Sequence, residues 1–341
     1  MRGWACLAAV VVAAMGGIGA ASCGGGSSGA DEGSNLPPRV RNDGGGGEEE
    51  IDGGGDSGNL TAFPINDDAS TNVNDTECDP KKPFKTPILL LDANTKSATP
   101  RLSHDELTIY FTADNGATST DLFRATRPTR TSAFGTPGTM TAQSSASNDN
   151  DPAPSADHLS IFFHTGRGGN NDLWVATRGS TATDFGMPAA VPNVNDATAA
   201  DAHPYYRSAG GGELYFTSVR NMSATYHIYL AKKNVAGFVT PVLIDELSGA
   251  WNDWQPMVTE DGLTMLFASD RPTAGSGMHL WIASRASDTA KWGTPQKIAE
   301  LEGVAPAVDF AGWISADRCR VYFSSNRDSV NQRVYFASRP L

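Results

Sequence analysis

The sequence predicts an all-β fold in which five repeated units close into a ring. Three observations support this prediction. A unit recurs about every 52 residues, short apolar strands alternate with turns, and the last unit lacks a strand that the start of the domain can supply. Short strands rich in Ile, Val, Phe, Tyr and Trp, without helical periodicity, indicate an all-β array.

A proline marks the start of the repeat. Pro100, Pro152, Pro204 and Pro256 are each 52 residues apart, and Gly312 takes this place in the fifth unit. Each unit then has a turn and a strand that ends in two large apolar residues. These pairs are Tyr110–Phe111, Phe162–Phe163, Tyr215–Phe216, Leu266–Phe267 and Tyr322–Phe323. Such pairs are expected where a strand is buried on both faces.

Four short strands per unit, at a period near 50 residues, match the blade of a β-propeller. The predicted units are 97–148, 149–200, 201–252, 253–304 and 305–341. The fifth unit ends at "ASRPL", whereas the earlier units close with "FGTP", "FGMP", "FVTP" and "WGTP". The segment "FKTP" at the other end of the domain resembles these closing segments, and the apolar "ILLL" follows it.

Residues 84–91 are therefore expected to complete the last blade, which makes residues 78–341 a five-bladed β-propeller closed by its N-terminal strand. An open solenoid is the competing architecture. A solenoid would not need its fourth strand moved to the start of the domain, so the ring is favoured.

The first 22 residues form an expected export signal, with a basic start, an apolar run and small residues at the exit. The exit "AASC" resembles a bacterial lipoprotein signal, and the resemblance implies lipidation of Cys23. An ordinary secretory signal followed by a chance cysteine is the alternative. Residues 23–77 are rich in Gly, Ser and acidic residues and are expected to be a disordered tether.

The net charge of −12 is concentrated in this tether, because residues 24–78 carry a net charge of −10. Residues 79–341 carry about −3 and show no basic stripe, so nucleic acid is not an expected partner. Contact with a membrane is expected only through the lipid. We expect an exported monomer in the bacterial cell envelope, in the periplasm or at the cell surface, with the outer membrane favoured.

Two cysteines remain once Cys6 leaves with the signal and Cys23 carries lipid. Cys78 precedes the closing strand, and Cys319 begins the middle strand of the blade that this strand would complete. In an oxidising compartment a Cys78–Cys319 disulfide is expected to clamp the ring. Two unpaired thiols are the alternative.

One aspartate and one arginine recur at a fixed offset in four units. The aspartates are Asp149, Asp201, Asp253 and Asp309, and the arginines are Arg167, Arg220, Arg271 and Arg327. Catalysis needs unlike residues whose surroundings separate their pKa values, whereas identical pairs suit repeated structural contacts. These residues are predicted to form partly buried pairs that join neighbouring strands or blades.

Segments such as "PMVTEDGLTMLFASDR" and "DLWVATR" resemble the TolB-type, WD-like propeller repeat, and the resemblance covers residues 84–341. Members of this family are mostly binding platforms, so the resemblance implies a binding role. The chain departs from TolB in having five predicted blades instead of six and no preceding α/β domain. A role specific to TolB is therefore not implied.

The binding site is expected where the repeat is broken, around the innermost strands. The predicted residues of this channel mouth are Arg101, His203, Tyr205, Trp251, Trp254 and Trp313. Exposed aromatic side chains around a concave opening suit sugar rings or peptide side chains. The alternative is that the tryptophans wedge between blades.

No catalytic residues, metal site or cofactor are predicted, because the six histidines are scattered and the chain has no H-E-x-x-H motif. The predicted function is a non-catalytic propeller that binds an envelope protein or glycan. The alternative is a glycan-processing enzyme that uses carboxylates in the channel. A structural envelope protein is a third possibility, which predicts an apolar patch on the rim.

Overall fold

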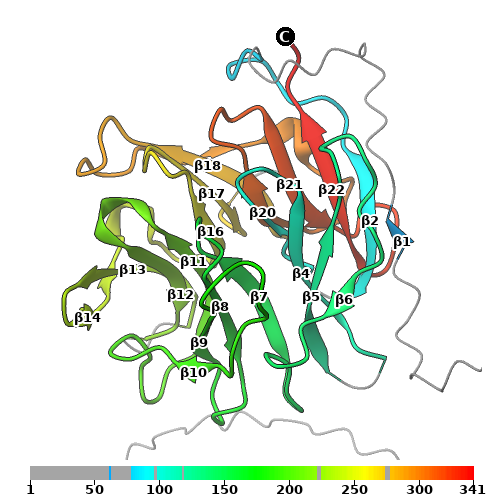
Figure 1. Ribbon diagram of the computed structural model, residues 1–341. Helices are drawn as coiled ribbons and strands as arrows, with labels where there is room; N and C mark the ends of the chain where they lie inside the picture. The colour runs from blue at the N-terminus through cyan, green and yellow to red at the C-terminus, as the bar shows by residue number, and fades with distance from the viewer. Residues whose placement is uncertain (1–60, 63–77, 96–97, 117–118, 221–223, 273–276) are drawn as a thin grey trace, which may run out of the picture. The chain divides into compact units, whose positions relative to one another are not determined.

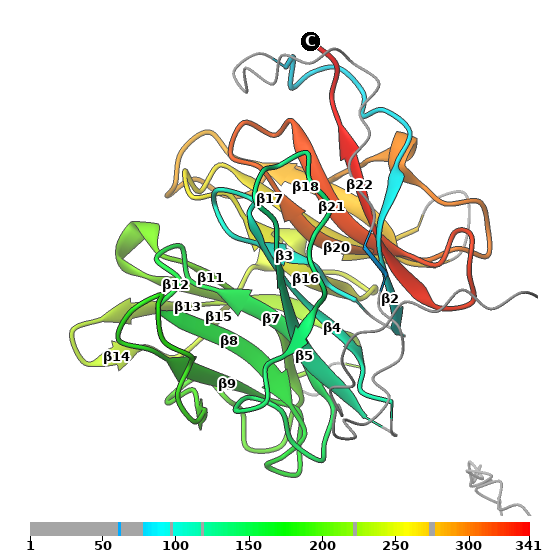
Figure 2. The ribbon, with the colours of Figure 1, turned by 45° about the vertical axis from the view of Figure 1, so that its right-hand side comes forward.

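The computed structural model describes residues 61–62, 78–95, 98–116, 119–220, 224–272 and 277–341, all within the unit Gly54–Leu341. These residues form five small antiparallel sheets, arranged as the blades of a propeller (Figures 1 and 2). The prediction of a five-bladed β-propeller is confirmed. The predicted signal and Cys23 lie outside the described residues.

Each of the first three blades is built from consecutive strands. Blade 1 contains β3 (Arg101–Leu102), β4 (Thr108–Asp114), β5 (Thr120–Thr126) and β6 (Gly138–Thr139). Blade 2 contains β7 (Asp149–Pro154), β8 (Ser160–Thr165), β9 (Asp172–Thr177) and β10 (Ala189–Ala190). Blade 3 contains β11 (Asp201–Arg207), β12 (Glu213–Ser218), β13 (His227–Asn234), β14 (Gly237–Phe238) and β15 (Val242–Leu243).

Blade 4 repeats this plan, and blade 5 combines both ends of the domain. Blade 4 contains β16 (Asp253–Val258), β17 (Thr264–Ser269), β18 (His279–Ser284) and β19 (Gln296–Lys297). Blade 5 contains β1 (Thr61–Ala62), β2 (Ile88–Thr95), β20 (Asp309–Ile314), β21 (Arg320–Ser325) and β22 (Gln332–Ser338). Among the described residues, three short 3-10 helices lie between strands: η1 (Ala209–Gly211), η2 (Asp245–Leu247) and η3 (Ala299–Leu301). In the described part of the chain, no helix has the length and apolar character needed to cross a membrane.

The apolar pairs of the repeat form the core between blades. The second residue of each pair is fully buried in all five blades. These residues are Phe111, Phe163, Phe216, Phe267 and Phe323. Burial of one phenylalanine side chain contributes about 1.5–3 kcal/mol, so five equivalent rings stabilise the packing of every blade on its neighbours.

In blades 2, 3, 4 and 5 a bulge interrupts the innermost strand, at the proline of the repeat or, in blade 5, at Gly312. In blades 2, 3 and 4 the residue before the proline has a positive φ of 54° to 56° at Asp151, His203 and Gln255, and the register of the sheet shifts there. In blade 5 Gly312 replaces the proline, because a Cβ atom there would lie only 2.6 Å from Pro100 Cγ of blade 1. The bulges re-aim the side chains of the inner strands.

The ring is closed by β2, which pairs with β22 at the registers Ile88↔Phe336 and Leu91↔Val334. In Figure 1 the cyan strand from the start of the domain lies beside the red strand from its end. Phe84 supplies the closing aromatic ring, and Arg339 Cζ lies 3.8 Å from the centroid of that ring. The predicted closure by the N-terminal strand is therefore confirmed.

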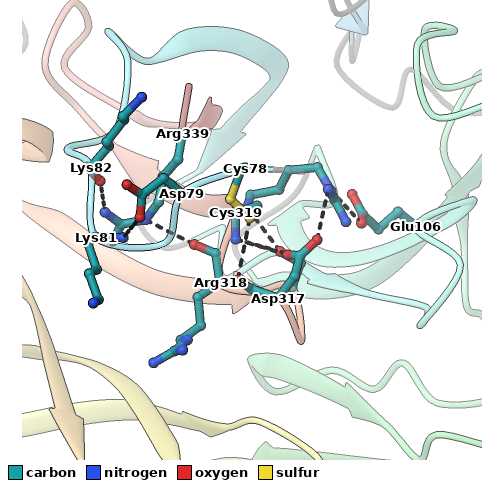
Figure 3. The surroundings of a disulfide bond; sticks show 11 residues. Cys78, Asp79, Lys81, Lys82, Glu106, Asp317, Arg318, Cys319 and Arg339 are labelled. Atoms are coloured by element: carbon teal, nitrogen blue, oxygen red, sulfur yellow. Dashed lines mark hydrogen bonds and ion pairs between the residues drawn. A yellow bond between two sulfur atoms is a disulfide. The ribbon is translucent and has the colours of Figure 1, made fainter. Parts of the chain in front are cut away.

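A disulfide joins Cys78 to Cys319 across a sequence separation of 241 residues, as predicted. Figure 3 shows this disulfide close to Asp317 and Glu106. Glu106 of blade 1 is buried and accepts hydrogen bonds from Tyr322 Oη at 2.6 Å and from Arg320 Nε at 2.8 Å, both in blade 5. A covalent bond and a buried polar contact thus hold the two sides of the closure.

Two residues of the predicted tether pair with the closing strand. Thr61 and Ala62 form β1 and pair with Asp92 and Leu91 of β2, whereas the rest of the predicted tether, residues 23–60 and 63–77, lies outside the described residues. Without β1, β2 would be an edge strand with unpaired backbone groups, and such groups attract a further strand.

The repeated aspartates and arginines form the predicted pairs. The distances from Nη2 to Oδ1 are 2.6 Å for Arg167–Asp149, Arg220–Asp201 and Arg271–Asp253, and 2.9 Å for Arg327–Asp309. Each aspartate is fully buried at the start of an inner strand, and each arginine follows the second strand of the same blade. Each guanidinium also donates to a backbone carbonyl near the end of the previous unit, for example Val194 O at 2.8 Å from Arg220. The pairs therefore join strands within a blade and one blade to the next.

A second set of basic residues fixes the outer edge of the blades. Arg127, Arg178 and Arg285 stack on the closing aromatic rings Phe134, Phe185 and Trp292 at 4.3–4.4 Å. Each also donates through Nε to the carbonyl of a turn residue in its own blade. The contact between Arg339 and Phe84 is the fifth-blade version of this arrangement, which explains why Phe84 belongs to the last blade.

Replacement Asp253→Asn is expected to lower the free energy of unfolding by about 3–5 kcal/mol, because it leaves Arg271 buried without its counter-charge. Urea unfolding of both proteins measures this difference. Asp184→Asn is the matched control, since Asp184 is 92% exposed and lies 3.8 Å from Arg124. An equal, small effect of both replacements would contradict a structural role for the pair.

Loss of the disulfide through Cys78→Ser and Cys319→Ser is expected to lower the free energy of unfolding by about 3–5 kcal/mol, because it frees a very long loop in the unfolded chain. Denaturant unfolding under oxidising conditions measures the change. Under reducing conditions the wild type should approach the double variant. If it does not, the bond does not provide this stability.

Candidate functional site

The centre of the ring is filled by side chains from four different blades. Gln255 Nε2 donates to Thr99 Oγ1 at 2.6 Å and to Asp151 Oδ1 at 3.4 Å. Asp151 Oδ2 lies 3.2 Å from His164 Nδ1 and 3.6 Å from His203 Nε2. Because these contacts cross between blades 1, 2, 3 and 4, the side chains meet at the axis. We call these five residues the central cluster.

The charges of the central cluster follow from its burial. Burial lowers the pKa of His203 to about 4, although Asp151 acts in the opposite direction. Burial by itself would raise the pKa of Asp151, but His203 and His164 outweigh it and hold that pKa below its usual range. At neutral pH the cluster therefore contains an ionised Asp151 beside an uncharged His203.

Arg101 lies next to this cluster, at the start of β3, two residues after Thr99. It is 1% exposed, and its Cζ lies 5.4 Å from the centroid of the Tyr205 ring. Arg101 Nη2 donates to the carbonyl of Pro256 in blade 4 at 3.3 Å. Burial lowers the pKa of Arg101 to about 10, with Asp151 opposing this shift, so the guanidinium stays charged at neutral pH.

A pocket opens at the end of the channel where Arg101 lies, and it has lining residues in all five blades. The enclosed space that the centres of water-sized molecules can occupy is about 40 Å³, and all space free of protein atoms, the open mouth included, is about 510 Å³. The inner lining includes Arg101, Leu102, Tyr205, Met257, Trp313 and Ile314. The remaining lining residues include His104, Ser155, His158, Tyr206, Thr259 and Glu260. We call this cavity the mouth pocket, and the central cluster separates it from the other end of the channel.

The six predicted binding residues do not share one mouth. Arg101, Tyr205 and Trp313 line the mouth pocket, as expected from their position after the proline of the repeat. His203 belongs to the central cluster, and its ring centroid lies 5.2 Å from that of Trp254. Trp254 precedes the bulge and therefore lies on the opposite side of the cluster.

The two tryptophans of the "GAWNDWQP" segment pack in different surroundings. Trp254 stacks between His203 and Phe310, at 5.2 Å and 5.7 Å between ring centroids, and so wedges between the inner strands of three blades. Trp251 lies 5.1 Å from Arg271 Cζ, beside one of the structural ion pairs. The alternative that these tryptophans wedge or pack fits both positions better than a common exposed mouth does.

Sequence reasoning missed Asp151 and His164. Asp151 stands at the position before the proline, where the other blades have Thr99, His203, Gln255 and Ala311. It is the one acid at that position of the repeat, and this departure from the pattern was the available signal. The aspartates that were considered, such as Asp149, are instead held by arginines.

A larger hollow, with about 1020 Å³ of space free of protein atoms when its open mouth is included, lies between the outer parts of blades 1 and 2 and is lined by Arg124, Gln143, Asp184 and Phe185. No group of three or more His, Cys, Asp or Glu side chains suited to a metal ion occurs in the part of the chain that the structure describes. The mouth pocket is therefore the better candidate, because it adjoins buried charged groups.

No protein-family model and no curated protein matches the chain. Among solved structures, the chain is similar to a glycoside hydrolase (8% identity, TM-score 0.56) over 76% of this chain and 93% of the other. It is also similar to an endo-arabinase from Bacteroides thetaiotaomicron (14%, 0.52), over 76% and 98%. These likenesses establish the fold alone. TolB from Acinetobacter baumannii is similar at 16% identity and a TM-score of 0.40, over 76% of this chain and 54% of that one.

Stability is expected to fall as the pH drops from about 6.5 to about 4, partly because of His203. Its pKa is lower in the folded than in the unfolded chain, so the unfolded chain binds the extra proton in this window, at about 1 kcal/mol per pH unit. Melting temperatures of wild type and His203→Gln measured between pH 7 and pH 4.5 test this. The variant should show the shallower slope; identical slopes would contradict burial of a neutral His203.

Proposed function

We propose that this protein is an exported, lipid-anchored binding module of the bacterial cell envelope, which holds a protein or glycan partner at the mouth pocket without catalysis. The observation that carries the proposal is a concave pocket with lining residues in all five blades beside a buried arginine. Polar and aromatic side chains around a concavity are typical of binding sites. The disulfide fits an oxidising compartment, which supports export.

The state of the acids favours binding over hydrolysis. A glycosidase needs two carboxyl groups on either side of the scissile bond, about 5–9.5 Å apart. The four repeated aspartates are fully buried and paired with arginines. Of the residues that line the mouth pocket, Glu260 is the one carboxylic acid. Asp151 is in contact with His164 and Gln255 in the central cluster.

A glycan-processing enzyme is the second candidate, and Asp151 is the observation in its favour. It is a buried carboxylate in the channel, unlike its equivalents in the other blades, and such asymmetry suits catalytic groups. In that case Asp151 would have to act together with a second acid such as Glu260.

The two functions differ in one experiment. The full chain is immobilised and incubated with envelope extract and with a panel of polysaccharides, and both the retained partner and newly released reducing ends are measured. We expect a retained partner, no reducing ends above background, and a loss of retention of about tenfold or more for the pocket variant His104→Ala/Tyr206→Ala. Arg124→Ala, outside the mouth pocket, is the control.

Asp151→Asn distinguishes the candidates further. Reducing ends released by the wild type and abolished by Asp151→Asn would replace the binding proposal with the enzyme. Undiminished retention by the His104→Ala/Tyr206→Ala variant would mean that the mouth pocket is not the binding site.

A further inference from the structure

The guanidinium of Arg101 has donor groups that the protein does not use. Among the described residues, Nη2 donates to Pro256 O, whereas Nε and Nη1 have no hydrogen-bond acceptor. Arg101 is only 1% exposed, so these donors are shielded from bulk solvent by the surrounding residues. A buried charged donor without an acceptor costs free energy, which an anionic ligand would offset.

We propose that the mouth pocket binds a carboxylate carried on an apolar stem, and that this carboxylate accepts hydrogen bonds from Arg101. The proposal rests on the proposed binding function and names the chemical group that the pocket recognises. An arginine in a partly desolvated pocket is well suited to a carboxylate, because charge-assisted hydrogen bonds are stronger than neutral ones.

The surrounding charges favour a carboxylate over a phosphate. Apart from two histidines, Arg101 is the one basic side chain among the lining residues. The negative charge of Asp151 already attracts its guanidinium and partly neutralises it. Glu260 also lines the pocket. A phosphate with nearly two negative charges would meet one guanidinium and two carboxylates, whereas a carboxylate brings a single charge.

The walls of the pocket favour an apolar stem. The lining includes the buried side chains Leu102, Met257, Trp313 and Ile314, which offer mainly carbon atoms to a ligand. Methylene groups bury well against such a wall. The hydroxyl groups of an acidic sugar would lose hydrogen bonds to water where they touch these four side chains. The carboxylate can belong to a free short-chain acid or to an acidic side chain of a partner.

Calorimetric titration of the full chain tests the proposal. The probes are butyrate and butyramide, the capped tripeptides acetyl-Ala-Glu-Ala-amide and acetyl-Ala-Gln-Ala-amide, and galacturonate. We expect at least one carboxylate probe to bind about tenfold or more tightly than its matching amide, and more tightly than galacturonate. Tighter binding of butyrate assigns the site to a free acid, and tighter binding of the glutamate peptide assigns it to a partner's side chain.

Arg101→Met is expected to abolish the preference for carboxylate over amide, and Arg124→Met, an arginine outside the pocket, is expected to keep it. Met257→Trp narrows the pocket without touching the charge and should weaken binding of the same probe about tenfold or more, which keeps the test valid if Arg101→Met fails to fold. An equal affinity for carboxylate and amide, a preference that survives Arg101→Met, unchanged binding by Met257→Trp, or galacturonate binding as tightly as butyrate would overturn the proposal.

The titration also separates this inference from the proposed function. Retention of an envelope partner by the full chain, together with equal affinity for carboxylate and amide, would leave the binding function standing and overturn the carboxylate inference. Carboxylate binding without any retained partner would support the inference and count against the envelope partner.

Discussion

The pairing of β2 with β22 is the constraint on which the other features depend. A blade buries its apolar faces only when a neighbour stands on each side, so a ring of five has no exposed end once the last blade is complete. The closure also brings Pro100 and Glu106 of blade 1 against blade 5. Only then do five inner strands converge on one axis, and the mouth pocket acquires lining residues in every blade.

Some positions of the repeat are the same in nearly every blade, and others differ in each blade. The paired aspartates and arginines are nearly identical from blade to blade, and their distances differ by only 0.3 Å between the shortest and the longest. The residue before the proline is instead different in every blade, from Thr99 to Ala311. The repeated pairs thus stabilise the fold, whereas the side chains that differ from blade to blade lie near the axis of the ring, where they can come together.

The fold could be predicted from the sequence because the pattern of one blade occurs five times in the chain. A period of 52 residues, the aromatic closing segments and the displaced "FKTP" required only comparison of the chain with itself. The disulfide followed from the closure. The site was harder, because contacts between residues such as Thr99 and Gln255 span 156 positions and depend on how the ring is closed. The burial of Arg101 and the separation of Trp251 from Trp254 depend equally on geometry that no local pattern contains.

The position of the disulfide has a mechanical consequence. Cys78 precedes β2, and Cys319 immediately precedes β21 in the middle of blade 5. A force that pulls on the chain before Cys78 therefore passes through a covalent bond into the interior of the blade, instead of peeling β2 away from β22 one hydrogen bond at a time. The strand that closes the ring is shielded from load, so the propeller can be held from its N-terminal side under tension and stay closed.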